Sequence, residues 1–373
     1  MTPLEAATHT DPYDYYARLR DEDELLFDTE LGMWIASRSE TVEAVLTHPD
    51  CRVRPPHEPV PPAIAQRATG QMFARLMRMN EGTAHRCPRS IIEPALAGLG
   101  ANHVAGVVTQ LSAGLNTLDE WTFTLPVSVV AHLLGVPREQ LRTVAGLTRD
   151  FVACLSPLSN AVQLQNADVG VSQLSQLFRG VLEETALLAL IRRGDWPDAQ
   201  VLNANLIGLL AQTCEATAGL IGNTRVMLSR RPELVEQVLR TPTLASALVE
   251  EVARYDSPVQ NTRRFVARRC AIGHRVVEAG DTILVLLACA NRDPGANANP
   301  DSFVLERPSR RTFSFGSGHH RCPGQRLAFA IASQAILEQL RRQPALPADA
   351  EQFTYWPSLN GRIPRFHSTL MRE

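Results

Sequence analysis

The sequence contains no lysine. Its 37 basic residues are all arginine and are balanced by 39 acidic residues, so the formal net charge is −2. This balance lacks the basic excess that nucleic-acid-binding proteins carry, and we expect no nucleic-acid partner. The exclusive use of arginine is better explained by the codon usage of a GC-rich bacterial genome than by a special function.

Paired cysteines and long apolar runs are also missing. Seven cysteines are scattered along the chain without a CxxC pair. An odd number in a chain of this length argues against a secreted disulfide framework and favours a reducing cytosol. The first 16 residues are polar and do not resemble a signal peptide. The strongest apolar run, Ile283–Ala290, is too short to span a bilayer. We therefore expect a soluble cytoplasmic protein with no membrane partner.

No repeat or linker divides the 373 residues, of which 45% are hydrophobic, and we predict a single domain over residues 1–373. Leu25–Asp28 and Met33–Ser37 flank a turn at Thr29–Gly32 and predict a β-hairpin. Strand-like runs follow much later, between Arg264 and Leu287, and are interrupted by glycines.

Helical periodicity dominates the rest. The longest such stretch, Asp198 to about Arg230, gives roughly nine turns, well beyond the usual globular helix. We expect it to cross the whole molecule. The apolar spacing predicts further helices at Ser39–Leu46, Val104–Leu118, Leu125–Leu134, twice within Glu233–Tyr255, and at Gly324–Arg342. The predicted fold class is mainly α with small β-sheets.

The sharpest signal is the ten-residue segment FGSGHHRCPG at 315–324. Gly316 and Gly318 allow a tight turn and a close approach to a flat ligand. Cys322 lies just before a predicted helix, whose N-terminal dipole favours a thiolate, and Pro323 suits the first helical position. A thiolate so placed is a soft anionic ligand suited to iron. The alternative is an ordinary buried cysteine in a glycine-rich turn.

The complete string resembles the heme-binding signature of cytochromes P450. This resemblance implies a long central helix over a heme b (iron protoporphyrin IX), with Cys322 as the ligand of its iron. It implies that Phe315 packs beneath the porphyrin and that His320 contacts a propionate. Gly316 and Gly324 belong to the same cofactor-binding loop.

A Glu-x-x-Arg motif, Glu251 and Arg254, lies about 70 residues before Cys322. Its two side chains meet on one helix face. An exposed pair of this kind would contribute under about 1 kcal/mol. The family resemblance instead implies a buried pair that locks the cysteine loop, with Arg307 as a candidate partner.

The resemblance also supplies candidates for the heme propionates. Arg264 matches the propionate-binding arginine, although Arg263 beside it leaves open which of the two points inward. His85 and Arg89 lie one turn apart and can neutralise a propionate together. Taken alone, they would be ordinary surface residues. Pro88 between them would remove a helical hydrogen bond unless it falls in the first turn.

The long helix departs from the family pattern of a small residue, glycine, any residue, an acid and threonine. The acid is Glu215, but Ala216 replaces the threonine whose hydroxyl holds the proton-donor network in the family. Thr217, Thr213 or a substrate hydroxyl could replace that function, and Gln212 lies on the same face as Ala216. The alternative is that Glu215 is a surface carboxylate and Gln212 merely packs.

The resemblance implies a monomeric monooxygenase that oxidises a small organic substrate in bacterial specialised metabolism. It would use O2 and electrons from a ferredoxin- or flavodoxin-type partner docking near Arg321 and Arg326. Ala216 leaves open peroxide-driven oxidation, dehydration or isomerisation, or oxidative bond formation. A non-catalytic heme- or ligand-binding protein is a third hypothesis. We expect the substrate pocket to be lined from 54–77, 151–171, 259–261 and 359–363.

Overall fold

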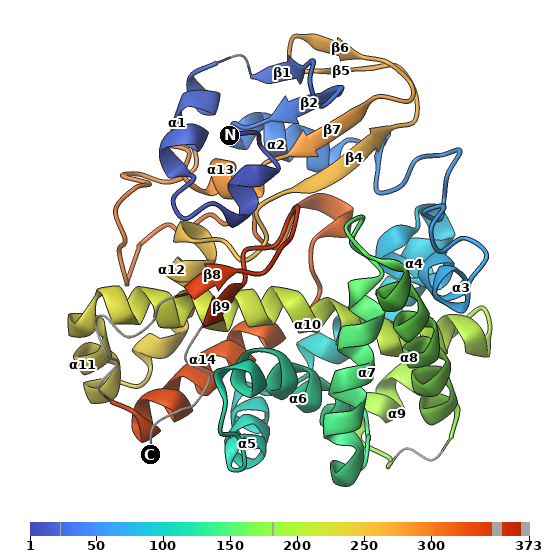
Figure 1. The fold of residues 1–373 in the computed structure, drawn as a ribbon, viewed down its shortest axis with the longest axis vertical. Coiled ribbons are helices and arrows are strands. Elements are labelled where there is room, and N and C mark those ends of the chain that lie inside the picture. The colour runs from blue at the N-terminus through green and yellow to red at the C-terminus, as the bar shows by residue number, and fades with distance from the viewer. Residues whose placement is uncertain (23, 181–182, 345–352, 367–373) are drawn as a thin grey trace. The chain divides into compact units, whose positions relative to one another are not determined.

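The computed structural model describes residues 1–22, 24–180, 183–344 and 353–366. It is mainly helical with small sheets, as predicted (Figure 1). The chain forms two compact units. Within the described residues, the first comprises Met1–Pro59, Gly222–Cys322 and the segment from 353 to 366, and we call it the sheet unit. The second comprises Val60–Ile221 and the segment from Pro323 to 344, and we call it the helical unit.

The sheet unit is built on a five-stranded sheet with strand order β1-β2-β7-β4-β3. The predicted hairpin is confirmed: β1 pairs antiparallel with β2, and Gly32 in the turn has a φ of +62°. β2 and β7 run parallel, whereas the other neighbours are antiparallel. These strands are β1 (Leu25–Asp28), β2 (Met33–Ala36), β3 (Cys51–Arg52), β4 (Thr262–Val266) and β7 (Thr282–Val285).

Alternation along the strands builds a core on each face of this sheet. Ile35 and Leu284 belong to one buried cluster, with Tyr16 of α1 (Tyr13–Asp21). Ala36 and Val285, one residue further along their strands, belong to the other cluster, with Val42 of α2 (Ser39–Thr47). The two-residue period of a strand separates these side chains onto opposite faces.

The remaining elements of the sheet unit are short. They are η1 (Glu5–Thr8), α11 (Pro232–Arg240), α12 (Leu244–Tyr255), α13 (Leu287–Asn291), η5 (Gly318–His320), the hairpin of β5 (Cys270–Ile272) and β6 (Arg275–Val277), and the hairpin of β8 (Phe353–Tyr355) and β9 (Pro364–Phe366). The two helices predicted within Glu233–Tyr255 are thus confirmed as α11 and α12.

The helical unit contains α3 (Ala68–Arg75), η2 (Met77–Met79), α4 (Gly82–Ala97), α5 (Ala101–Ser112), the π-turn η3 (Glu120–Thr124), α6 (Leu125–Leu133), η4 (Arg138–Gln140), α7 (Leu141–Ala153), α8 (Ala161–Arg179), α9 (Ala186–Arg192) and α14 (Gln325–Arg342). The predicted long helix is α10 (Ala199–Arg230), which belongs to the helical unit as far as Ile221 and to the sheet unit from Gly222.

One helix prediction is wrong at its end. The helix expected over Val104–Leu118 stops at Ser112, although Leu115 and Leu118 are buried. The Glu120 carboxylate accepts the backbone N–H groups of Asn116 and Thr117, at 2.8 and 3.1 Å. The backbone N–H groups of Asn116 and Thr117 therefore find acceptors without a helix. The prediction ran too far because the helical spacing of apolar residues continues through Leu115 and Leu118, which are buried beyond the end of α5.

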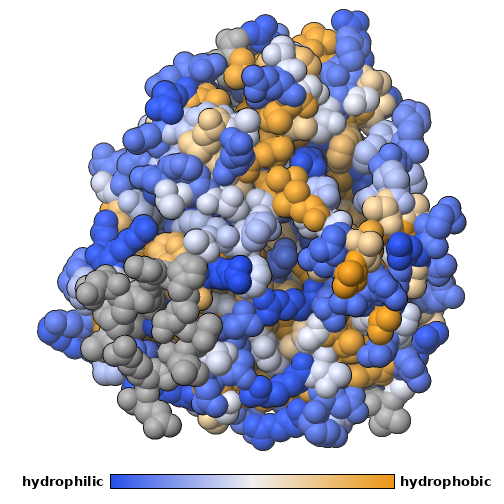
Figure 2. All heavy atoms as spheres, in the orientation of Figure 1, coloured by the Kyte–Doolittle hydropathy of each residue, from blue (hydrophilic) through white to orange (hydrophobic). Residues whose placement is uncertain are grey.

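The face of the molecule in Figure 2 is covered mainly by hydrophilic residues, with apolar side chains in scattered groups. Such exposed apolar side chains are ordinary for a folded chain. Among the described helices, none is by itself long and apolar enough to cross a membrane; α4 and α5, bent by 81° at their junction, meet that test only as a pair.

Candidate functional site

The cysteine loop is closed by backbone hydrogen bonds of its own. The N–H of Cys322 donates to the carbonyl of Phe315 at 2.8 Å, and that of Gly316 donates to Phe313 at 2.8 Å. Both Gly316 and Gly318 adopt left-handed conformations, with φ of +70° and +67°. The thiol of Cys322 is half-buried and forms no disulfide. The loop therefore holds a cysteine outside any disulfide on a tightly folded backbone.

The two glycines of this loop serve different purposes. A side chain at Gly318 would lie 3.0 Å from Cγ2 of Thr47 and 3.2 Å from the carbonyl of Leu46, so this glycine permits packing against the end of α2. A side chain at Gly316 would meet nothing nearer than 3.8 Å, at the carbonyl of His320. The two positions therefore differ in how tightly they pack, and the close approach of a flat ligand stays a prediction for both.

The start of α14 corrects the prediction for Pro323. The helix begins at Gln325 with Gly324 as its N-cap, so Pro323 precedes the cap and does not occupy the first helical position. The proline still lacks an N–H beside Cys322. The backbone donors that follow the thiol are therefore those of Gly324 and Gln325.

The Glu251–Arg254 pair on α12 is fully buried. Oε1 of Glu251 lies 2.7 Å from the Arg254 guanidinium, and both side chains have no exposed surface. Arg307, the predicted partner, donates from Nε to the same carboxylate oxygen at 3.1 Å. Arg254 in turn donates to the carbonyls of Asn291, Pro300 and Ser302. The motif thus ties α12 to the segment that leads to the cysteine loop.

Sequence reasoning missed a third arginine in this cluster. Arg310 donates from Nε to Oε2 of Glu251 at 3.0 Å and pairs with Glu250 at 2.8 Å. Burial alone would raise the pKa of Glu251, but hydrogen bonds from Arg254, the Val304 N–H and Arg310 hold it below its ordinary value. Glu251 is therefore ionised at neutral pH.

A second buried ion pair was also missed. Arg362 donates from Nε to Oδ1 of Asp256 at 2.6 Å, and the Tyr13 hydroxyl donates to the same oxygen at 2.5 Å. Although burial opposes the charge, Asp256 raises the pKa of Arg362 above its ordinary value. No local signal could have revealed this pair, because its two members are separated by 106 residues.

The structure separates the two neighbouring arginines of β4. Arg264 shares the buried face of the strand with Val266, and only 6% of its surface is exposed. Its guanidinium donates to the carbonyl of Arg263 at 2.9 Å. Arg263 is only half-buried, and desolvation lowers its pKa. Arg264 is thus the inward-facing member of the pair.

His85 and Arg89 lie one turn apart on α4 in the helical unit. His85 is 3% exposed, whereas Arg89 forms two hydrogen bonds of 3.0 Å to the Glu93 carboxylate. Pro88 lies in the interior of this helix and not in its first turn, so the helix lacks the bond that its N–H would make to Ala84. The pairing with Glu93 was not foreseen.

The polar side chains of the atypical segment of α10 bond mainly to their own helix. Nε2 of Gln212 donates to the carbonyl of Gly208 at 3.0 Å, and the hydroxyl of Thr213 donates to Leu209 at 2.8 Å. Thr217 is buried and Ala216 is half-buried. Each donation commits one N–H or O–H to a backbone acceptor. The Oε1 atom of Gln212 takes no part in that bond.

Glu215 is exposed to solvent in this segment. The surrounding protein nevertheless raises the pKa of its carboxyl by desolvation, an effect that the charges of Arg78 and Arg149 oppose. A carboxyl that reaches solvent and holds its proton more tightly than usual is suited to donate a proton. Cys214 beside it is buried, and burial raises its pKa to about 12, so it is an ordinary core thiol.

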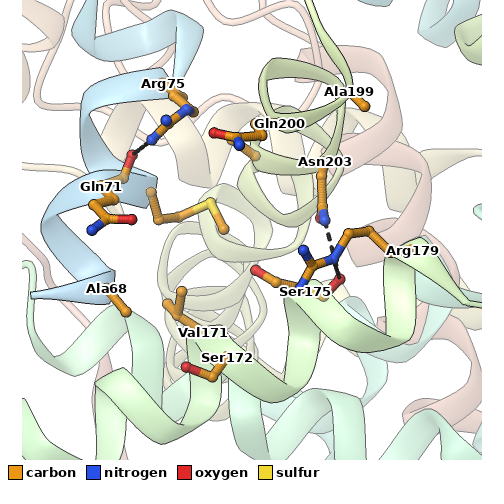
Figure 3. Close-up of a pocket in the computed structure, with 12 residues that line it drawn as sticks. Ala68, Gln71, Arg75, Val171, Ser172, Ser175, Arg179, Ala199, Gln200 and Asn203 are labelled. Carbon is orange, nitrogen blue, oxygen red and sulfur yellow. Dashed lines mark hydrogen bonds between the residues drawn. The ribbon is translucent and has the colours of Figure 1, made fainter.

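A pocket of about 310 Å³ opens in the helical unit between α3, α8 and α10 (Figure 3). Arg75 of α3 and Arg179 of α8 lie on opposite sides of it, and each donates to a carbonyl of its own helix. Gln71, Ser172, Ser175, Gln200 and Asn203 add polar groups, Ala68, Val171, Ala199 and Ala204 are apolar, and Met72 brings a thioether. Its α3 wall lies within the segment 54–77 that we predicted to line the substrate pocket.

Comparison with known proteins decides the family. The family model for cytochrome P450 matches residues 205–343, which include the Glu251 cluster and the cysteine loop. The curated protein "Cytochrome P450 monooxygenase PikC" of Streptomyces venezuelae is 28% identical over 368 residues, covering 93% of this chain and 88% of that one. The chain belongs to the cytochrome P450 family.

Further comparisons extend this match over the whole P450. "Vitamin D(3) 25-hydroxylase" of Pseudonocardia autotrophica is 28% identical and covers 90% of this chain and 87% of its own. The crystal structure of P450BioI in complex with an acyl carrier protein carrying hexadec-9Z-enoic acid matches with a TM-score of 0.83 at 25% identity, over 95% of this chain and 96% of that one. CalO2 shares the fold at the same TM-score and 23% identity. The mainly α fold class is thereby confirmed, and the P450 is an enzyme of the monooxygenase class.

The residues present fit the heme that this family uses. In the sheet unit, the Cys322 thiol is half-buried without a disulfide, and Arg264 is a buried cation. In the helical unit, the imidazole of His85 is buried. Thiolate is a soft ligand for iron, and buried cations suit propionates.

Proposed function

We propose that this P450 is a single domain over residues 1–373 that binds heme b through Cys322 and oxidises a small organic substrate of bacterial specialised metabolism. The observation that carries the proposal is the closed cysteine loop, whose half-buried Cys322 thiol forms no disulfide. The neighbouring structures cover 93–99% of this chain, which supports one domain rather than two. Phe315 and His320 of the same loop, together with Arg264, His85 and Arg89, would contact the porphyrin and its propionates.

The heme thiolate supplies the activation of O2, including cleavage of the O–O bond. The chain must hold the heme and deliver protons. Glu215 is the proposed proton source, because it is an exposed carboxyl whose pKa is raised by desolvation. Gln212 would present Oε1 to the ligand bound at the heme iron. Its amide N–H donates to the carbonyl of Gly208. Exposed Arg321 and Arg326 favour an acidic electron donor of the ferredoxin or flavodoxin type.

The pocket of Figure 3 would receive a polar end of the substrate. Asn203 and Glu215 are twelve residues apart on α10, which corresponds to about 18 Å along the helix axis. A ligand held by Arg75 and Arg179 would therefore need to be extended to reach the segment around Glu215. The two guanidinium groups favour a carboxylate or phosphate on that ligand.

The test of the heme ligand is spectroscopic. The purified protein, reduced under carbon monoxide, should give the red-shifted Soret band of a thiolate-ligated heme, and Cys322→Ala should lack it. A wild-type band at the position typical of a neutral axial ligand would contradict the proposal. Product formation with O2 and a reconstituted ferredoxin chain would then establish the monooxygenase reaction.

A second function is favoured by Ala216, which removes the hydroxyl expected in the proton-donor network. Peroxide-driven oxidation and dehydration or isomerisation bypass the proton delivery that O2 activation needs, and oxidative bond formation is the remaining alternative. Ala216→Thr separates the candidates. If O2 and a ferredoxin are the native reactants, the substitution should raise the product formed per electron a few-fold. If peroxide or no oxidant is native, turnover should stay unchanged or fall.

A further inference from the structure

Three side chains that ligate metals meet in the sheet unit, on segments other than the cysteine loop. They are His48, Cys51 and Cys270, and their ligand atoms all lie within 4.8 Å of one another. His48 follows α2, Cys51 begins β3 and Cys270 begins β5. Cys51 is 2% exposed, whereas the other two are half-buried. The cluster is thus anchored in the core and open to solvent on one side.

The backbone around these residues is pinned on both sides. The N–H of Cys51 donates to the carbonyl of His48 at 3.1 Å, which closes a His-x-x-Cys turn. The segment between β4 and β5 is fastened to this turn by two contacts. The N–H of Ala267 donates to the carbonyl of Asp50 at 2.8 Å, and the Arg268 guanidinium pairs with the Asp50 carboxylate at 2.8 Å. Cys270 follows Arg268 by two residues. The cluster therefore forms from segments already fastened together.

Two sulfurs and one imidazole nitrogen are a ligand set that zinc prefers. Around a tetrahedral zinc ion the donor atoms of such a set lie roughly 3.5–3.8 Å apart. The separations within 4.8 Å therefore need to close by only about 1 Å. The Cys51 and Cys270 sulfur atoms already lie within 4.8 Å of each other, and neither cysteine forms a disulfide. Nδ1 of His48 accepts the N–H of Asp50 at 3.1 Å, a weak contact that a metal ion would replace.

We propose that His48, Cys51 and Cys270 bind one Zn²⁺ ion, with water as the fourth ligand. Binding converts two thiols into thiolates and releases two protons, so the metallated site carries no net charge. The ion would join the turn after α2 to β5 and cross-link the edge of the five-stranded sheet. A disulfide is the competing fate of the two cysteines, and the experiment below distinguishes it from metal binding.

The experiment uses the full heme-loaded chain under reducing conditions. The protein is stripped with a chelator, dialysed against buffered micromolar Zn²⁺, and its zinc and heme contents are measured together. We expect one zinc ion per heme in the wild type and in Cys87→Ser, a half-buried cysteine of the helical unit. Cys51→Ser and Cys270→Ser should retain none, and His48→Ala should bind at least tenfold more weakly.

The controls keep this result independent of folding and of the cysteine loop. Cys270 is half-buried at the start of a two-stranded hairpin, so Cys270→Ser should keep the thiolate-heme Soret band with carbon monoxide. His319→Ala tests zinc held by the exposed imidazole of the cysteine loop and should leave the stoichiometry unchanged. Equal zinc contents in the wild type and Cys270→Ser would overturn the proposal. A Cys51–Cys270 disulfide in the wild type that binds no zinc after reduction would do the same.

Discussion

Two polar regions of this P450 differ in where their side chains find hydrogen-bond partners. The cluster around Glu251 in the sheet unit keeps the family's Glu-x-x-Arg motif, and three arginines surround one buried carboxylate. The segment 212–217 of α10 in the helical unit has lost the family's alcohol, and Gln212 and Thr213 bond to their own helix. In the first region each group depends on several others, so one replacement leaves a buried charge unpaired. In the second, Gln212 and Thr213 each depend on one backbone acceptor of their own helix, so replacing either should cost little stability.

The largest effect is expected from Glu251→Ala. Removing the carboxylate leaves Arg254 buried without its counter-charge, which typically costs about 3–5 kcal/mol. Chemical denaturation should show this loss in the free energy of unfolding. Glu236→Ala is the matched control, because its i,i+4 pair with Arg240 is 71% and 78% exposed and should contribute under about 1 kcal/mol. Equal losses for the two variants would show that burial does not set the difference.

The contribution of the Glu251–Arg254 pair to the free energy of unfolding should also depend on pH. The pKa of Glu251 in the folded state lies below its ordinary value of 4.5, so its stabilising contribution is complete above that value. The contribution is lost as the pH falls through the lowered folded-state pKa. The difference in stability between the wild type and Glu251→Gln should therefore shrink in acid. A difference that grows as the pH falls would contradict the assigned direction.

The next effect concerns Glu215 on α10. Glu215→Gln keeps the size of the side chain and removes its proton, so product formation per electron should fall about 100-fold. Because the pKa of Glu215 is raised, wild-type turnover should decline as the pH rises through that pKa, and the variant should lose this limb of the pH profile. Glu139→Gln, at an exposed position, is the control. An unchanged pH profile would make Glu215 a surface carboxylate.

A smaller effect should separate the two glycines of the cysteine loop. Both have positive φ, so replacement by alanine costs about 1–2 kcal/mol at either position. Gly318→Ala adds contacts at 3.0 and 3.2 Å with Thr47 and Leu46 and should destabilise the protein further. Gly316→Ala meets only ordinary contacts, the nearest at 3.8 Å from the carbonyl of His320, and should instead weaken heme retention because it changes the proposed heme-binding loop. Identical stability and heme content in the two variants would remove the distinction.

The smallest effect is expected at the pocket of Figure 3, because several residues that line it are exposed to solvent. Arg75→Ala should raise the KM for a carboxylate- or phosphate-bearing substrate about fivefold and leave kcat unchanged, since water screens the charge. Its neutral analogue should show no change. Arg240→Ala, an exposed arginine of α11, controls for the loss of one positive charge. A fall in kcat alone would place Arg75 outside substrate binding.

The sequence alone determined much of this P450. The apolar period of the long helix predicted α10 to within one residue, and the β1–β2 hairpin followed from its turn. The cysteine loop and the Glu-x-x-Arg motif are contiguous, so their chemistry can be recognised without the fold. Local spacing also sufficed to place Glu251 and Arg254 on one helix face.

Only the tertiary structure decided the rest. Arg310, the Asp256–Arg362 pair and the His48–Cys51–Cys270 cluster join residues that lie far apart in the sequence. α3 was not predicted, and its first turn is capped by Asp168 of α8, which accepts the N–H of Thr69 at 3.1 Å. The end of α5, by contrast, is accompanied by a local contact, because Glu120 accepts the N–H of Asn116 only four residues before it. Local periodicity reports which side chains are buried, whereas distant charge partners and the start of α3 depend on groups that only folding brings together.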